Sequence, residues 1–247
     1  MQAFALTDIG KKRASNQDFV YASTEPVGAF PNFFILADGM GGHKAGDYAS
    51  RFLTEELVSF VSGSESGAPV RVLQEGIAEV NSKIYRKACD EDDYRGMGTT
   101  LVAATVSDGF LTAVNVGDSR LYIINNEIRQ VTRDHSLVEE LVVMGALSRD
   151  SDAYRKKKNI ITRAVGIEQN VRPDFYDEEL CDGDYVLLCS DGLTNMVGDD
   201  GILSTVTGSG SLEYKVKELI REANENGGTD NIAVILFRYT EGGDLNA

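Results

Sequence analysis

Short apolar and β-branched runs recur along the chain with turn residues between them, a pattern typical of β-strands. Strands are expected at 4–9, 19–23, 33–37, 100–106, 111–116, 120–124, 128–131, 185–189 and 232–239. Helical periodicity appears at 49–61, 73–84, 137–144 and 212–223. Because helices and strands do not alternate regularly, a doubly wound parallel sheet is disfavoured. We predict an α+β fold, with a central antiparallel β-sandwich flanked by helices on both sides in four layers, α-β-β-α.

No linker divides the sequence. Only four of the 247 residues are proline, and no Pro/Ser-rich stretch occurs. One domain is therefore expected over residues 1–240, followed by a frayed tail over 241–247. Asn125 and Asn126 are candidates for a tight hairpin between two of the strands, because Asn tolerates a positive φ.

The chain carries a large excess of acidic residues. Asp and Glu number 39 against 24 Lys and Arg, so the formal charge is −15. This charge disfavours binding to nucleic acid or to an anionic membrane surface, but it does not disfavour binding of cations. Neither a signal peptide nor an apolar run of about 20 residues is visible. The three cysteines are too few for a disulfide scaffold, so a cytoplasmic location is expected.

Cys89 and Arg95 stand in a C-x5-R spacing, which thiol-dependent phosphatases use to wrap a phosphate around a thiolate. The intervening residues, 90–94, include four carboxylates. These charges would repel a phosphate and raise the pKa of the thiol. We therefore interpret the segment as a solvated acidic loop after a helix.

A set of aspartates lies at the edges of the predicted core strands. The set consists of Asp18, Asp38, Asp118, Asp191 and Asp230. Each of them alone would be ordinary turn chemistry. Partly buried carboxylates are costly unless they are paired, however, and the chain has only two histidines and few basic residues near these positions. Divalent metals would supply the missing positive charge, and oxygen ligands suit Mg²⁺ and Mn²⁺.

These aspartates belong to a series of short motifs. In chain order the motifs are R-x-x-N-Q-D (13–18), A-D-G-M-G-G-H (37–43), G-x-T (98–100), V-G-D-S-R (116–120), D-H-S (134–136), I-T-R-A-V-G (161–166), S-D-G-L (190–193) and G-x-x-D-N (227–231). Each motif is weak alone, but the series is highly specific. Over residues 7–231 the chain resembles the metal-dependent serine/threonine phosphatases of the protein phosphatase 2C (PPM) family, in particular its compact bacterial members.

The resemblance implies a central β-sandwich with a binuclear Mg²⁺ or Mn²⁺ centre at one end. Asp38 would bridge the two metals. Asp191 and Asp230 would hold the first metal, and Asp18 with the carbonyl oxygen of Gly39 would hold the second. The implied reaction is hydrolysis of phosphoserine and phosphothreonine in proteins by a metal-activated water.

Further roles follow from the same resemblance. Asp118 would help to bind a third, weaker metal, and Arg13 would grip the substrate phosphate through bidentate hydrogen bonds. His43 is the candidate general acid, although it could instead orient water or simply pack, because eukaryotic relatives carry their histidine where this chain has Met40. We interpret His135 as structural.

The partners implied are phosphoproteins, in particular substrates of a cognate Ser/Thr kinase, and the protein is expected to be a monomer. Residues 145–166 match the flap of the family, beside the active site. Within it, residues 156–158 are three consecutive lysines. We interpret them as a solvated run, the alternative being a contact with acidic phosphopeptides. A catalytically dead metal-binding module on the same fold is disfavoured, because degenerate relatives usually lose metal ligands.

Overall fold

The computed structural model describes residues 1–42, 44–148, 151, 153 and 160–241, and contains two antiparallel sheets. The first sheet has the order β1 (Gln2–Asp8), β11 (Ile232–Arg238), β10 (Tyr185–Cys189), β7 (Arg120–Ile124), β8 (Ile128–Gln130). The second has the order β2 (Asp18–Ser23), β3 (Phe33–Met40), β5 (Leu101–Ser107), β6 (Phe110–Val116), β9 (Asp174–Glu179), and the short β4 (Gly98–Thr99) pairs with β3. His43 and the lysines at 156–158 lie outside the described residues.

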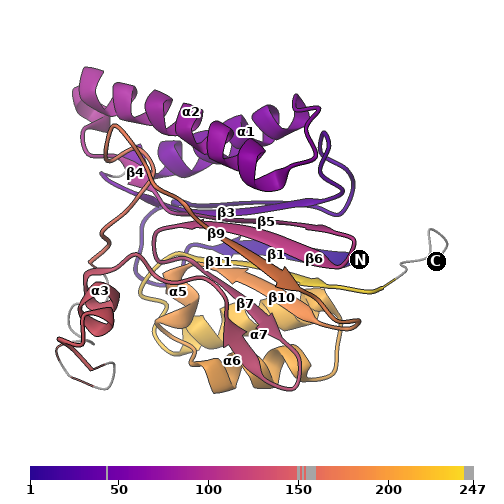
Figure 1. Cartoon of the computed structure of the whole chain (residues 1–247). Helices are drawn as coiled ribbons and strands as arrows, with labels where there is room; N and C mark the ends of the chain where they lie inside the picture. Colours follow the sequence, from indigo (N-terminus) through magenta and orange to yellow (C-terminus); the bar gives the residue numbers. More distant parts are fainter. Residues whose placement is uncertain (43, 149–150, 152, 154–159, 242–247) are drawn as a thin grey trace.

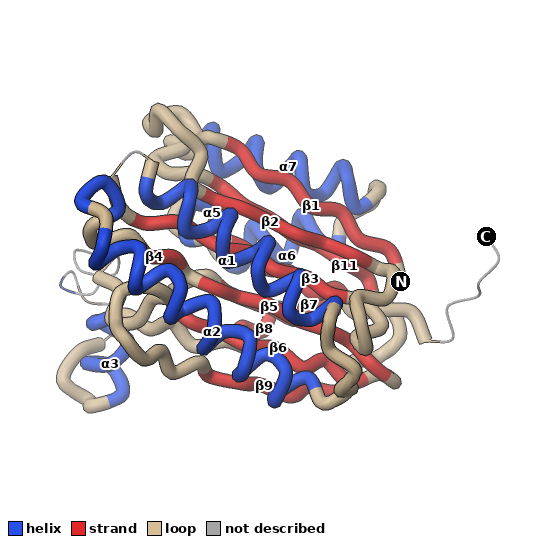
Figure 2. Tube along the Cα trace, turned by 90° about the horizontal axis from the view of Figure 1, so that it is seen from above, coloured by secondary structure: helices blue, strands red, loops and turns tan. Residues whose placement is uncertain are grey.

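Helices cover the outer face of each sheet (Figure 1). The second sheet is covered by α1 (Ala45–Ser62) and α2 (Pro69–Asp90), which lie over its strands in Figure 2. The first sheet is covered by α5 (Asp191–Thr194), α6 (Asp199–Thr207) and α7 (Leu212–Glu225). The predicted four-layer α+β sandwich is confirmed.

Strand β3 shows how the sequence produces these layers. Side chains alternate across a strand, so one set faces each side of the sheet. Phe33 and Ile35 pack with the helices of the upper layer, whereas Phe34 and Leu36 pack between the sheets, where Phe34 stacks on Phe237 with ring centroids 4.2 Å apart. Both faces are buried, which is why this strand is a continuous apolar run.

Predicted helix ends and turns were largely observed. Helix α1 ends before Gly63, and the side chains of Ser136 and Ser211 cap α3 (Leu137–Val143) and α7 by accepting backbone N–H bonds. The predicted hairpin joins β7 and β8. The reason given for this hairpin was wrong. The loop has three residues, 125–127, and neither asparagine has a positive φ. Among the described non-glycine residues, a positive φ occurs at Asp108.

Strand β9 and helix α6 were not predicted, nor were the short β4, the short α5 and the 3₁₀ turn Asp92–Tyr94. Four of the six residues of β9 are acidic and the strand lies at a sheet edge, and α6 has only two fully buried side chains. Among the described residues, no helix combines the length and the apolarity that a bilayer crossing requires.

Candidate active site

Asp18 and Asp38 are brought face to face by the pairing of β2 with β3, in which their Cα atoms are register partners. Ser190 Oγ donates a 2.8 Å hydrogen bond to Asp18 Oδ2. Burial raises the pKa of Asp18 to about 7, and burial together with the charges of Asp18 and Asp191 raises the pKa of Asp38 well above its ordinary value. The two strands thus force carboxylates into a site that disfavours their charged form.

Asp191 and Asp230 approach the same place from the other sheet. Asp191 follows β10 and begins α5, and Asp230 lies two residues before β11. A Cβ on Gly192 would lie only 1.9 Å from the carbonyl oxygen of Asn231, so glycine permits the close contact between these two segments. The Asn195 amide donates 2.9 Å to Asp191 Oδ2. The charges of Asp191 and Asp230 raise the pKa of both Asp18 and Asp38, so the four carboxylates lie close enough to repel one another.

Asp118 lies in the turn between β6 and β7. His135 Nδ1 accepts a 3.1 Å hydrogen bond from the N–H of Gly117, on one side of Asp118. On the other side, Ser119 Oγ lies 2.8 Å from Thr100 Oγ1, which in turn accepts the N–H of Asp38. Burial, and next the charge of Asp191, raise the pKa of Asp118 to about 8. The structure therefore places Asp118 near Asp38 and Asp191.

The carboxylate oxygens of the site suit a divalent cation. Asp18 Oδ1 and Asp118 Oδ1 are buried and make no hydrogen bond in the described part of the chain. Oxygen donors of this kind are the ligands that hard cations prefer. Within the described residues, no three Asp, Glu, His or Cys side chains already form a ready ligand set. The fit to a metal therefore rests on buried charge, unpartnered oxygens and donor chemistry.

Gly39 follows Asp38 in β3, and its N–H donates 3.0 Å to the carbonyl of Gln17. A Cβ at this position would lie 2.0 Å from the carbonyl oxygen of Gly46 in α1. Glycine is thus required for α1 to begin directly against the site.

Arg13 lies at the rim, with its side chain about half exposed (49%). Its Nη2 donates 2.7 Å to Asp230 Oδ2. A small hollow of about 120 Å³ is lined by this side chain together with Gln17 and Gly41. The arrangement holds a guanidinium beside the carboxylates, where it can bind an anion.

Several polar residues that support the site were not singled out from the sequence. Asn231 Nδ2 donates to the carbonyls of Ile9 and Ser15, and its Oδ1 accepts the N–H of Gln17, so this residue joins the loop of Arg13 to the segment of Asp230. Its position in the G-x-x-D-N motif was the available signal. His135, interpreted as structural, is buried and contacts Asp174 Oδ2 at 3.0 Å.

Comparisons with known proteins agree with this arrangement. A family model described as Protein phosphatase 2C matches residues 10–236. Protein phosphatase PhpP of Streptococcus pneumoniae is 41% identical over 245 residues, 98% of each chain. A solved serine/threonine phosphatase of S. agalactiae has a TM-score of 0.90 at 39% identity, covering 97% of this chain and 99% of its own. The catalytic domain of the serine/threonine protein phosphatase PstP, solved with two manganese ions, has a TM-score of 0.85 at 33% identity, covering 97% of this chain and 98% of its own. The chain belongs to the protein phosphatase 2C family.

Proposed function

We propose that the protein hydrolyses phosphoserine and phosphothreonine in phosphoproteins at a binuclear Mg²⁺ or Mn²⁺ centre. The observation that carries the proposal is the meeting of Asp18, Asp38, Asp191 and Asp230 in a partly buried site beside Arg13. The family supports the reaction class, and the manganese-bound PstP relative supports the choice of metal.

The roles proposed for the aspartates follow their positions. Asp38 lies opposite Asp18 and feels the charges of the other aspartates, as expected of a residue shared by two ions. Asp191 and Asp230 would hold the first ion, and Asp18 with the Gly39 carbonyl the second. Divalent ions held there would activate a water at neutral pH and offset the charge of the phosphoryl oxygens.

The remaining chemistry falls to residues at the rim. Asp230 holds the guanidinium of Arg13 in place through Nη2, and the rest of the planar fork can bind two phosphoryl oxygens. This contact orients the phosphate and stabilises the charge that develops on it. Asp118, held by the turn described above, is proposed for a third, weaker ion. His43 remains the proposed proton donor to the leaving alkoxide.

Other proposals complete this assignment. We propose one catalytic domain over 1–240, a flap at 145–166, a monomer, and substrates shared with a cognate Ser/Thr kinase. Helix α3, before the flap, stands out from the body of the protein in Figure 1. The three cysteines are free, which supports a reducing cytoplasm.

One assay tests the proposed function against a thiol mechanism. EDTA should abolish hydrolysis of a small aryl phosphate and of a phosphothreonine peptide, and Mn²⁺ should restore both. Asp38→Asn should lower kcat by roughly 100-fold or more, whereas Cys89→Ser and the exposed control Asp93→Asn should retain it. Hydrolysis that persists in EDTA, or full activity of Asp38→Asn, would refute the proposal.

A further inference from the structure

A second, larger cavity adjoins the candidate active site. Its volume is about 740 Å³, and residues 161–164 and 167–172 together with Met40 line it. Met40 lies two residues after Asp38 in β3, and the next residue, Gly41, lines the small hollow beside Arg13. The cavity and the phosphate-side hollow therefore meet at the end of one strand.

The wall of this cavity is held in place by hydrogen bonds. Val165 and Thr99 exchange both backbone bonds, at 2.9 and 3.0 Å. From α2, the Asn81 side chain accepts the N–H of Gly166 and donates to the carbonyls of Glu168 and Gln169. Buried polar contacts of this kind fix a loop without regular structure, so the cavity is preformed.

The lining combines apolar and cationic groups. Apolar surface is supplied by Met40, Ile161, Ile167 and Val171. A Cβ on the neighbouring Gly98 would collide with Ile167, so glycine at this position leaves space for the Ile167 side chain. Two arginines, Arg163 and Arg172, lie in the same wall of a chain whose net charge is −15.

Both arginines can reach a ligand. The contacts that Arg163 makes within the described residues all use Nη1, which bonds Asp174 Oδ1 and the carbonyl of Arg172. Its Nε and Nη2 make no hydrogen bond within the described part of the chain, so they can serve a ligand. Arg172 is exposed and forms no ion pair with another residue that the structure describes.

We propose that this cavity binds the residues flanking the phosphorylated Ser or Thr of a protein substrate, and that it selects an acidic residue close to the phosphorylated position. An extended peptide advances about 3.3 Å per residue, so neighbours one to three positions away enter the cavity when the phosphate lies beside Arg13. The guanidinium groups of arginine bind carboxylates through charge-assisted hydrogen bonds. The apolar surface of the cavity would contact the aliphatic carbons of the peptide side chains. This inference rests on the proposed function and names its substrate class.

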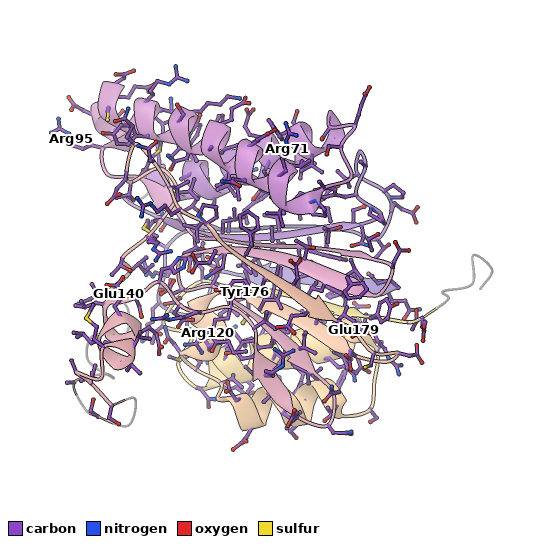
Figure 3. All side chains as sticks on the ribbon, viewed as in Figure 1. Arg71, Arg95, Arg120, Glu140, Tyr176 and Glu179 are labelled. Carbon is purple, nitrogen blue, oxygen red and sulfur yellow. The ribbon has the colours of Figure 1, made fainter. Side chains whose placement is uncertain are left out.

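The test compares two phosphothreonine peptides that differ only in flanking residues, acidic in one and basic in the other. The wild-type protein should prefer the acidic peptide in kcat/KM, and Arg172→Glu should lower that preference about tenfold. Arg172→Gln should lower it by less. The control is Arg71→Glu, an equal charge change in the first turn of α2, on the outer helix layer (Figure 3).

A ratio between two peptides is unaffected by the fraction of folded enzyme. The inference is overturned if the wild-type protein does not discriminate between the peptides, or if Arg172→Glu changes the ratio no more than Arg71→Glu does. Mn²⁺-dependent turnover of a small aryl phosphate by the wild-type protein is measured in parallel. Its loss would count against the proposed function itself rather than against the cavity.

Discussion

Replacing Asp18 with Asn should stabilise the metal-free protein and weaken its stabilisation by Mn²⁺. The Asp18 side chain is buried, with Asp38 opposite it. An Asn at this position keeps an oxygen that can accept the bond from Ser190 Oγ, and its NH₂ group takes the place of the buried oxygen that makes no hydrogen bond to any described residue. The substitution therefore removes a buried charge without leaving a cavity.

The size of the effect follows from the pKa of Asp18, which burial raises from 3.8 to about 7. The unfolded carboxyl loses its proton near pH 4, whereas the folded one retains it to near pH 7, so stability falls as the pH rises between these values. At 1.36 kcal/mol per pKa unit, ionisation of Asp18 lowers the free energy of unfolding by about 4 kcal/mol at pH 8 and by about 2 kcal/mol at pH 5. Relaxation around buried charges makes these figures upper limits.

Urea unfolding in EDTA at pH 5 and pH 8 measures this cost. At pH 8, Asp18→Asn should gain about 1 to 4 kcal/mol of unfolding free energy over the wild-type protein, and less at pH 5. The exposed control Asp93→Asn removes one charge and should gain nothing comparable. Added Mn²⁺ should stabilise the wild-type protein more than Asp18→Asn. If Asp18→Asn is no more stable than wild type at pH 8, the reading of this site as an assembly of buried charges is wrong.

Three further results are expected. Arg13→Lys, which removes the planar fork, should lower kcat/KM for a phosphopeptide by roughly 10- to 100-fold; near-normal steady-state kinetics would argue against a phosphate contact. His135→Ala removes the acceptor for the Gly117 N–H and should raise the Mn²⁺ concentration for half-maximal activity about tenfold. His135→Asn, which keeps an acceptor near Nδ1, should recover most of that loss, and an equal shift in both variants would contradict a role through Gly117. His43→Gln should slow a phosphoserine peptide more than a small aryl phosphate, whose leaving group needs no proton; equal slowing would exclude a general acid.

The sequence predicted the buried elements best. Both bounds of β7 and β10 were predicted correctly, because their buried residues form uninterrupted apolar runs. Strand β9 has no buried residue, and acidic side chains at a sheet edge resemble a loop, although they protect the edge from pairing with another chain. In α6 only Ile202 and Val206 are buried, too few to establish a helical period.

The residues of the candidate site could be predicted from the sequence, but their arrangement in space could not. Each aspartate was visible at a strand edge, yet the opposition of Asp18 and Asp38 depends on the register of β2 with β3. The approach of Asp191 to Asp230 depends on a contact between Gly192 and Asn231. Pairings of this kind join segments far apart in sequence, and no local pattern specifies them. The family resemblance, rather than periodicity, assigned a role to each residue.

Elsewhere in the protein a buried carboxylate is paired with a cationic side chain. Asp134 is buried, and Arg120 meets it with three hydrogen bonds of 2.7 to 3.1 Å. At the candidate site Arg13 pairs with Asp230 at the rim, but the two most buried aspartates, Asp18 and Asp118, are supported differently. Asp18 accepts a hydrogen bond from the neutral hydroxyl of Ser190. Asp118 has a buried oxygen that makes no hydrogen bond in the described part of the chain. A lysine or arginine bonded to Asp18 or Asp118 would occupy the place of a divalent ion and cancel the charge that attracts it. The neutral supports therefore keep the site acidic, and the instability that this causes in the metal-free protein is the driving force that metal binding would relieve.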